Sequence, residues 1–183
     1  MKKSVLILLL FCSQFTLSHA STIGFDAEDS AIASGDIFTV DIVGSGFPIT
    51  QGGGVDLFYN AAIVNVLSVT FDVAVWGIGS SVGAIDNSAG RVTDIVVGAF
   101  DGPQGTFVIA SLELEATGVG LTSLSLTDSS INPWASFGAR LTTAYVPGSV
   151  SVAPPVPLPA AFWLFGSALL GFVGLVRSRL HFR

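Results

Sequence analysis

Apolar and polar residues alternate along the middle of the chain. The run Ile37–Val43 puts its apolar side chains Phe38, Val40 and Ile42 on one face of an extended chain and its polar side chains on the other. The run Leu112–Ala116 alternates in the same way. A period of two residues is typical of a β-strand with one buried face. The pattern therefore predicts a sheet whose other face meets solvent.

Similar runs follow one another from residue 21 to residue 152, separated by segments rich in Gly, Pro, Asn, Asp and Ser. The pattern predicts about eight or nine short strands and no amphipathic helix. An all-β fold follows, an antiparallel β-sandwich or jelly roll. The remaining expected strands are Thr22–Ala27, Val55–Tyr59, Val64–Thr70, Val92–Phe100, Thr106–Leu114, Leu121–Leu126 and Ser149–Val152. The expected turns are Gly44–Gly46, Gln51–Gly54, Asp86–Gly90, Asp101–Pro103 and Asn132–Pro133.

The first twenty residues have the organisation of a secretory signal peptide. A short basic segment, Met1–Lys3, precedes the apolar run Val5–Phe11, and Ser18–Ala20 has the small-x-small pattern of a cleavage site. We expect cleavage between Ala20 and Ser21. The one cysteine of the chain lies in this segment, so the mature chain would contain no disulfide and its domain would rely on its core alone.

The last residues form a second apolar run, Ala160–Val176, which carries no charge and is followed by Arg177, Arg179 and Arg183. As a helix rising 1.5 Å per residue, this run would cross most of a hydrocarbon core of about 30 Å. The arginines act as a basic stop, because positive charges stay on the cytoplasmic side of a membrane. The pattern predicts one C-terminal transmembrane helix.

The residues before this helix are Val156, Pro157, Leu158, Pro159 and Ala160. This pentapeptide, followed by an apolar helix and a basic tail, resembles the PEP-CTERM family of bacterial sorting signals and matches its VPLPA-CTERM subtype. The resemblance implies that residues 153–183 are a sorting signal, recognised and cleaved by an exosortase. Proteins with this tail share it alone, so it indicates a destination and not an activity.

Charge is distributed unevenly along the chain. The segment between the two terminal signals contains all thirteen Asp and Glu residues but only two cationic residues, Arg91 and Arg140, which gives a formal charge of −11. Nucleic-acid binding requires a basic surface and is excluded. An acidic exported domain is soluble, and its carboxylates suit divalent cations or a basic partner.

The same segment lacks the side chains on which most catalysis depends. Its flanks hold the only two histidines, His19 and His181, and it contains no Cys and no Lys. Serine, cysteine and Ser-Lys catalytic sites are therefore excluded, and so are zinc sites of the usual ligands. Glu113 and Glu115 share one face of a strand, which fits the wet face of a sheet better than an acid/base pair. We expect a protein that is not an enzyme.

Two kinds of ligand remain compatible with the residues. Asp26, Glu28, Asp29 and Asp36 supply several oxygens within a short stretch and are candidate calcium ligands, although they lack EF-hand spacing and also fit a solvated acidic loop. No other cofactor is expected.

Tryptophans beside turn residues give a second candidate site. Trp76 precedes Gly77, and Trp134 follows Pro133. Exposed rings in such places stack on sugars in carbohydrate-binding modules, whereas buried ones fill a sandwich core. Both interpretations stay open.

A second resemblance concerns the sandwich itself. The order and spacing of Gly35–Ile42, Gly54–Val66, Phe107–Leu126 and Gly148–Val152 resemble the cohesin-like family, although Tyr59-Asn60-Ala61 stands where that family usually has Tyr-Asp-Pro. The resemblance implies a nine-stranded jelly-roll sandwich, whose type members bind dockerin modules through one sheet face.

Together these observations predict three parts: a signal peptide at 1–20, a cohesin-like sandwich at 21–152 and the sorting signal at 153–183. We expect a protein secreted across the inner membrane of a Gram-negative bacterium, membrane-anchored as a precursor, and periplasmic, at the cell surface or in the extracellular matrix when mature. Its partners would be the exosortase and either exopolysaccharide or another surface protein. The predicted function is non-catalytic binding or structure; the alternative is a carbohydrate- or calcium-binding module that acts on exopolysaccharide.

Overall fold

The computed structural model describes residues 20–27, 32–155 and 165. The chain divides into two units, Met1–Ala153 and Pro154–Arg183. Among the described residues, no helix has the length and apolar character needed to cross a membrane. Apart from Ala20 and Phe165, the predicted signal peptide and transmembrane helix lie outside the described residues.

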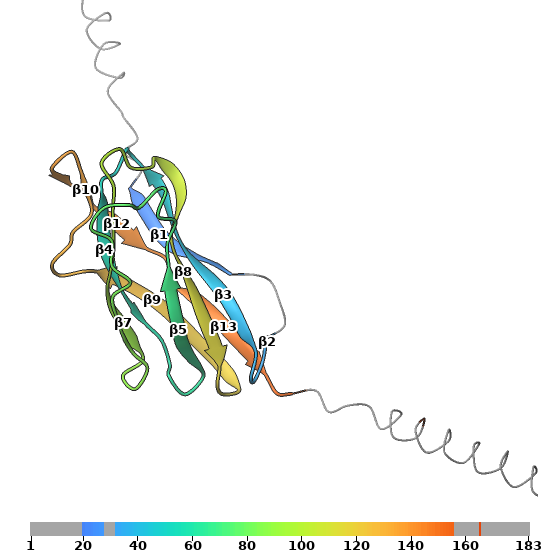
Figure 1. Ribbon diagram of the computed structural model, residues 1–183. Coiled ribbons are helices and arrows are strands. Elements are labelled where there is room, and N and C mark those ends of the chain that lie inside the picture. Colours follow the sequence, from blue (N-terminus) through green and yellow to red (C-terminus); the bar gives the residue numbers. More distant parts are fainter. Residues whose placement is uncertain (1–19, 28–31, 156–164, 166–183) are drawn as a thin grey trace, which may run out of the picture. The chain divides into compact units, whose positions relative to one another are not determined.

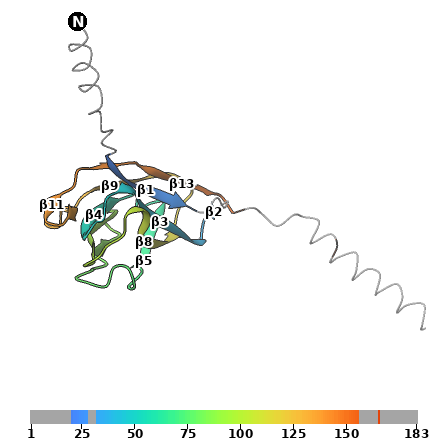
Figure 2. The ribbon, with the colours of Figure 1, turned by 90° about the horizontal axis from the view of Figure 1, so that it is seen from above.

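The first unit is built from two packed β-sheets (Figures 1 and 2). The first sheet has the strand order β12–β1–β3–β8–β5. Its strands are β12 (Thr143–Tyr145), β1 (Ser21–Ala27), β3 (Ile37–Phe47), β8 (Gly105–Ala116) and β5 (Val64–Thr70).

The second sheet has the order β11–β10–β4–β9–β13–β2, with β7 paired to β4 and β6 paired to β7. All pairs are antiparallel except β1–β12 and β13–β2. The predicted antiparallel sandwich is therefore confirmed. The strands are β11 (Ala139–Arg140), β10 (Ala135–Ser136), β4 (Gly52–Phe58), β9 (Gly120–Asp128), β13 (Gly148–Ala153), β2 (Ile32–Ala33), β7 (Arg91–Gly98) and β6 (Ala84–Asp86).

The core lies between the sheets and is formed by the alternating apolar positions. Val40 and Ile42 of β3 are fully buried, as are Leu112 and Leu114 of β8, while Glu113 between them is exposed. Apolar burial of this kind stabilises the fold by roughly 25 cal/mol per Å². Because the segment 21–152 contains no cysteine, this burial holds the two sheets together without a disulfide.

Two glycine-rich segments that were expected to be turns lie inside strands. Gly44–Gly46 belongs to β3, which shifts register against β8 between Gly44 and Phe47. Gly52–Gly54 forms the start of β4. At Gly53 a Cβ atom would stand 2.4 Å from the ring of Trp134, so the absent side chain makes room for a core residue. Glycine here serves close packing and not a change of direction.

Candidate binding face

The outward side of β4, β9 and β13 forms a face of small polar side chains with two large apolar ones. We call Phe58, Leu121, Ser123, Ser125, Ser149 and Ser151 the open face; each of these residues is exposed. Their neighbours Leu57, Leu124 and Val150 point into the core. Strand pairing sets Phe58 opposite Ser125 and Leu121 opposite Ser151. The alternation therefore presents these six uncharged side chains to solvent, with Asp56 two residues before Phe58 on the same side of β4.

A hollow of about 500 Å³ lies on this face where β4 ends. Its walls include Phe58 and Leu121, whose exposed fractions are 38% and 70%, and the hydroxyls of Ser123 and Ser125. Apolar surface beside a few polar groups is the usual composition of a ligand site. The hollow is the part of the open face best suited to hold a ligand group.

Hydrogen bonds hold the chain segments that line the hollow. The N–H of Asn60 donates to Thr122 Oγ1 over 3.0 Å, which joins the chain after β4 to β9. The Tyr59 hydroxyl donates to Asn87 Oδ1 over 2.6 Å. Burial raises the pKa of Tyr59 above its ordinary value, so its hydroxyl keeps its proton at neutral pH. The hollow is thus preformed by a bonded frame.

One ion pair borders the open face. Arg91 of β7 lies directly opposite Phe58, and its Nε atom is 3.8 Å from Asp86 Oδ2. A hydrogen bond from the Ser88 hydroxyl lowers the pKa of Asp86 below its ordinary value. Both side chains of the pair are largely exposed, so the pair contributes little stability. Its position gives the open face a polar rim.

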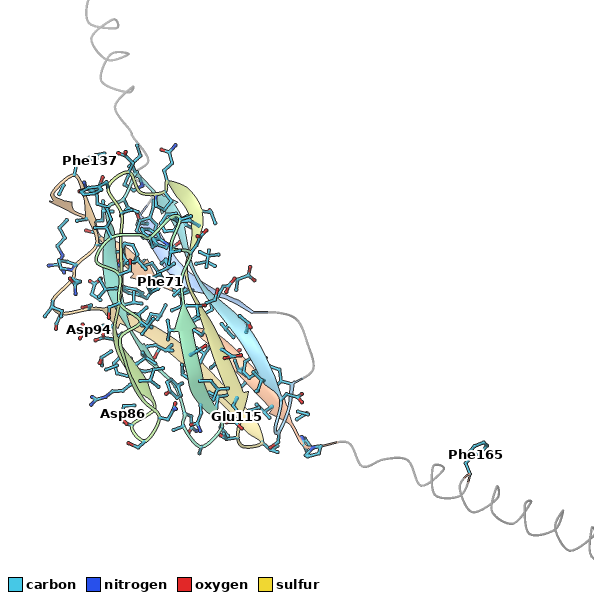
Figure 3. All side chains as sticks on the ribbon, in the orientation of Figure 1. Phe71, Asp86, Asp94, Glu115, Phe137 and Phe165 are labelled. Atoms are coloured by element: carbon cyan, nitrogen blue, oxygen red, sulfur yellow. The ribbon has the colours of Figure 1, made fainter. Side chains whose placement is uncertain are left out.

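The outer face of the first sheet is different, because it is acidic. Asp26 of β1 lies directly opposite Asp41 of β3, and Glu113 and Glu115 follow on β8 (Glu115 is labelled in Figure 3). Glu113 accepts a hydrogen bond from the Ser68 hydroxyl over 3.1 Å. The two glutamates lie on the solvent-facing side of the sheet.

The two candidate sugar-stacking residues are in the core. Trp76 and Trp134 are each 1% exposed, so neither offers a ring face to a sugar, which corrects that expectation. Trp76 packs on Phe107 with ring centroids 5.5 Å apart, and Phe47 packs on both Phe107 and Trp134 at 5.2 Å. The Trp76 indole N–H donates to the Val108 carbonyl over 3.0 Å. These rings stabilise one end of the sandwich.

The candidate calcium ligands are only partly described. Glu28 and Asp29 lie outside the described residues. Asp26 is on β1, and Asp36 is in the turn before β3, where its carboxylate accepts a hydrogen bond of 2.8 Å from the Ala33 N–H. Among the residues that the structure describes, no group of three or more His, Cys, Asp or Glu is arranged to hold a metal ion. The binding of calcium stays a prediction.

The two apolar residues of the open face were not identified from the sequence. The signal was present at Leu121, because the buried positions Leu124 and Leu126 place it on the outward side of β9. Thr122 points inward instead and is 2% exposed. A leucine on the outer face and a threonine on the inner one reverse the usual order, and such a reversal often marks a functional surface.

The described sandwich is similar to solved cohesin domains. A non-cellulosomal cohesin from the hyperthermophilic archaeon Archaeoglobus fulgidus matches with a TM-score of 0.60 and 12% identity, over 74% of this chain and 92% of that one. A type I cohesin–dockerin complex from Clostridium thermocellum gives a TM-score of 0.58 and 11% identity, over 74% and 100%.

A third similar structure is the sixth cohesin of scaffoldin B from Acetivibrio cellulolyticus in complex with a dockerin, with a TM-score of 0.59 and 14% identity, over 74% and 100%. No protein-family model matches the sequence, and no curated protein matches it either. Identities this low establish a shared fold. The described domain is therefore a cohesin-like β-sandwich.

Proposed function

We propose that the sandwich is a non-catalytic module that binds another protein through the open face. The observation that carries the proposal is the shallow hollow of about 500 Å³ that Phe58 and Leu121 border together with Ser123 and Ser125. Two of the similar cohesin structures are complexes with dockerins, which supports a protein partner. The absence of His, Cys and Lys between residues 21 and 152 supports binding without catalysis.

The composition of the open face suits this role. A protein interface buries a central group of large apolar residues inside a polar rim. Phe58 and Leu121 supply apolar groups on either side of Ser123 and Ser125, and the Arg91–Asp86 pair supplies a polar rim beside Phe58. A partner that presents a small apolar side chain to the hollow and hydroxyl or amide groups around it would be complementary.

Site-specific photo-crosslinking in the host tests the proposal. A crosslinking residue at Ser125 of the open face is expected to capture one defined protein. The same residue at Thr39, on the outer face of the first sheet, is the matched control and is expected to capture none. Equal capture from both positions, or capture only of a second copy of the chain, would contradict a partner-binding face.

We also propose that the protein is exported and sorted by an exosortase. The last residue of β13 is Ala153, and Pro154 and Pro155 after it are exposed. The pentapeptide Val156–Ala160 begins at the next position, so a short stiff spacer separates the folded domain from the processing site. This placement supports access by a membrane-embedded protease.

Intact-mass measurement of the protein from host strains with and without the exosortase tests this second proposal. Processing predicts a chain that starts at Ser21 in both strains. Its end should lie near Val156–Ala160 only in the strain that has the exosortase. A chain that runs to Arg183 in both strains would show that the tail is a plain anchor.

Carbohydrate binding at the hollow is the alternative for the open face. The exposed ring of Phe58 lies beside the polar groups of Asn60, Ser123 and Ser125, a combination that also suits a sugar. Binding of exopolysaccharide that is lost on Phe58→Ser, together with no protein crosslink from Ser125, would favour the sugar over the protein partner.

A further inference from the structure

A second hollow, of about 580 Å³, is lined by residues at the start of β1 and by residues at the end of the β10–β11 hairpin. Figure 1 shows where β1 and β10 lie, and the hairpin residue Phe137 is labelled in Figure 3. We call it the N-terminal hollow. Its lining includes Ala20 and Ser21 on one side and Arg140, Leu141 and Thr142 on the other, with Pro48 between them. The predicted signal-peptide cleavage site is thus part of its wall.

Ser21 is held firmly at this place. It is 5% exposed, it pairs with Thr143 of β12, and its hydroxyl lies 3.4 Å from the Gly46 carbonyl. Removal of residues 1–20 would turn the Ser21 nitrogen from a neutral peptide group into an ammonium group at this fixed position. The departure of Ala20 would also enlarge the hollow.

The second cation of the N-terminal hollow is Arg140. Hydrogen bonding of the Leu141 N–H to the Trp134 carbonyl over 2.8 Å fixes the backbone beside it. Its side chain is 69% exposed, and its Nη2 atom stands 3.7 Å from Asp128 Oδ2, a long and exposed ion pair that contributes little stability. Signal cleavage would therefore place two cations at one hollow of a domain whose net charge is strongly negative.

The only carboxylate that these contacts bring near the two cations is already engaged. Asp128 Oδ1 accepts hydrogen bonds from the Tyr145 hydroxyl at 2.5 Å and from the Thr143 hydroxyl at 3.3 Å. One carboxylate against two cations leaves an excess positive charge. An ammonium group without a paired carboxylate gains from charge-assisted hydrogen bonds to an anion, so the hollow favours an anionic ligand.

We propose that signal cleavage completes a site in the N-terminal hollow for a carboxylate-bearing sugar, that is, a uronic acid residue. The Ser21 ammonium and the Arg140 guanidinium would bind the two carboxylate oxygens by charge-assisted hydrogen bonds. Pro48 and Leu141 offer apolar walls to the carbon face of a sugar ring, and Thr142 offers a hydroxyl to the ring hydroxyls. The inference rests on the export and signal processing proposed above.

The negative charge of the domain limits what this site accepts. The acidic outer face of the first sheet would repel a long polyanion, so a short uronate oligomer or the end of a chain is preferred over the interior of a polymer. The uronic acid is also distinguished from a neutral sugar by one full charge. Digalacturonate and the corresponding neutral galactose disaccharide are therefore the informative pair of probes.

Calorimetry with the chain Ser21–Arg183 in detergent tests the site. The same chain with Ala20 retained as its first residue keeps a peptide bond at the Ser21 nitrogen and refills the hollow. We expect digalacturonate to bind the chain that starts at Ser21 at least tenfold more tightly than the chain that starts at Ala20. The neutral disaccharide should bind neither.

Matched substitutions give the second readout. Arg140→Gln should weaken digalacturonate binding at least tenfold, whereas Arg140→Lys, which keeps the positive charge, should weaken it less. Binding should also fall as the pH rises through about 8, the ordinary pKa of an α-amino group. Burial raises the pKa of Tyr145, so its hydroxyl does not titrate in that range. The charged groups at the hollow are Arg140 and its ion-pair partner Asp128.

Different results would refute the signal processing and the binding site. A mature protein that does not start at Ser21 would refute the signal processing. A protein that starts at Ser21 but binds digalacturonate equally well with Ala20 retained, or with Arg140→Gln, would refute the site while processing stands. Equally tight binding of trialanine, a peptide carboxylate without a sugar ring, would refute the assignment to a uronic acid.

Discussion

The carboxylate of Asp56 accepts a hydrogen bond of 2.7 Å from the backbone N–H of Asp94. Asp94 has a positive φ of 58° at a β-bulge, where the register between β4 and β7 shifts (Asp94 is labelled in Figure 3). A bulge leaves one backbone group outside the strand ladder. Asp56 satisfies that group, and the Asp94 carboxylate in turn accepts the Ser129 hydroxyl over 2.7 Å.

Asp56→Ala should therefore destabilise the domain by about 1 to 3 kcal/mol, because it leaves a partly buried N–H without a partner. The measurement is the free energy of unfolding in urea. Asp72→Ala is the control: Asp72 also accepts a backbone N–H, from Ala74 at 2.9 Å, but in an exposed loop where water can replace it. Equal losses for the two variants would contradict the role assigned to Asp56.

Asn87 links the turn after β6 to the edge strand β5. Its amide accepts from the Val66 N–H at 2.9 Å and donates to the Val66 carbonyl at 3.0 Å, and it also accepts the Tyr59 hydroxyl. Asn87→Ala should cost about 2 to 3 kcal/mol, and Tyr59→Phe about 1 kcal/mol. Because the residues share a bond, the double variant should lose less than the sum of the two single losses. Additive losses would show that the contact is energetically unimportant.

Gly53 lies against the ring of Trp134 at one end of the core. Gly53→Ala should destabilise by about 3 kcal/mol, because the new methyl group must displace a buried ring. Gly24→Ala is the matched control in a strand, since its nearest neighbour, Val146 Cβ, would stand 3.3 Å away and can yield. A loss within about 1 kcal/mol is expected there. Tryptophan emission during unfolding reports both variants, and similar midpoints would contradict the account.

The strands were predictable from the sequence wherever alternation alone decided the structure. The bounds of β5, Val64–Thr70, match the prediction in full, and the buried face of β3 holds Val40 and Ile42 as expected. Glycine was misleading at Gly52–Gly54, because the sequence does not reveal that Trp134, far along the chain, requires the space. The short strands β2, β6, β10, β11 and β12 were missed because they are defined by long-range pairing and carry too few residues to show a period.

The candidate site was harder to predict for a related reason. A tryptophan beside a turn residue is exposed or buried according to what packs on it, and the partners of Trp76 and Trp134 come from distant segments. The open face likewise depends on which strands lie next to β9, and neither neighbour, β4 or β13, adjoins it in sequence order as a hairpin partner would. The local sequence pattern identifies which side chains of a strand face solvent, but not which strands lie next to it.

Alkaline titration should report the two tyrosines of the chain directly. Burial raises the pKa of Tyr59, and burial together with the Asp128 carboxylate raises the pKa of Tyr145. A raised pKa in the folded state means that the unfolded chain loses its protons first as the pH increases. Stability should be constant up to about pH 9.5, near the ordinary tyrosine value of about 10, and should then fall.

Tyrosinate absorbs at 295 nm, so the increase in absorbance at this wavelength with pH follows the tyrosines above the background of the tryptophans. Tyr145→Phe should flatten the loss of stability above pH 10. Ordinary tyrosine titration in the folded protein, or an unchanged pH profile in the variant, would contradict the burial described for these hydroxyls.

The most direct test of the binding face is the affinity of the partner crosslinked at Ser125 for two variants of the full chain. Phe58→Ser removes the aromatic wall of the hollow, and Leu67→Ser removes an apolar side chain of similar exposure from β5 of the first sheet. We predict at least a tenfold loss of affinity for Phe58→Ser, as for a central interface residue, and no change for Leu67→Ser. Unchanged affinity on Phe58→Ser, or an equal loss for both variants, would contradict binding through the open face.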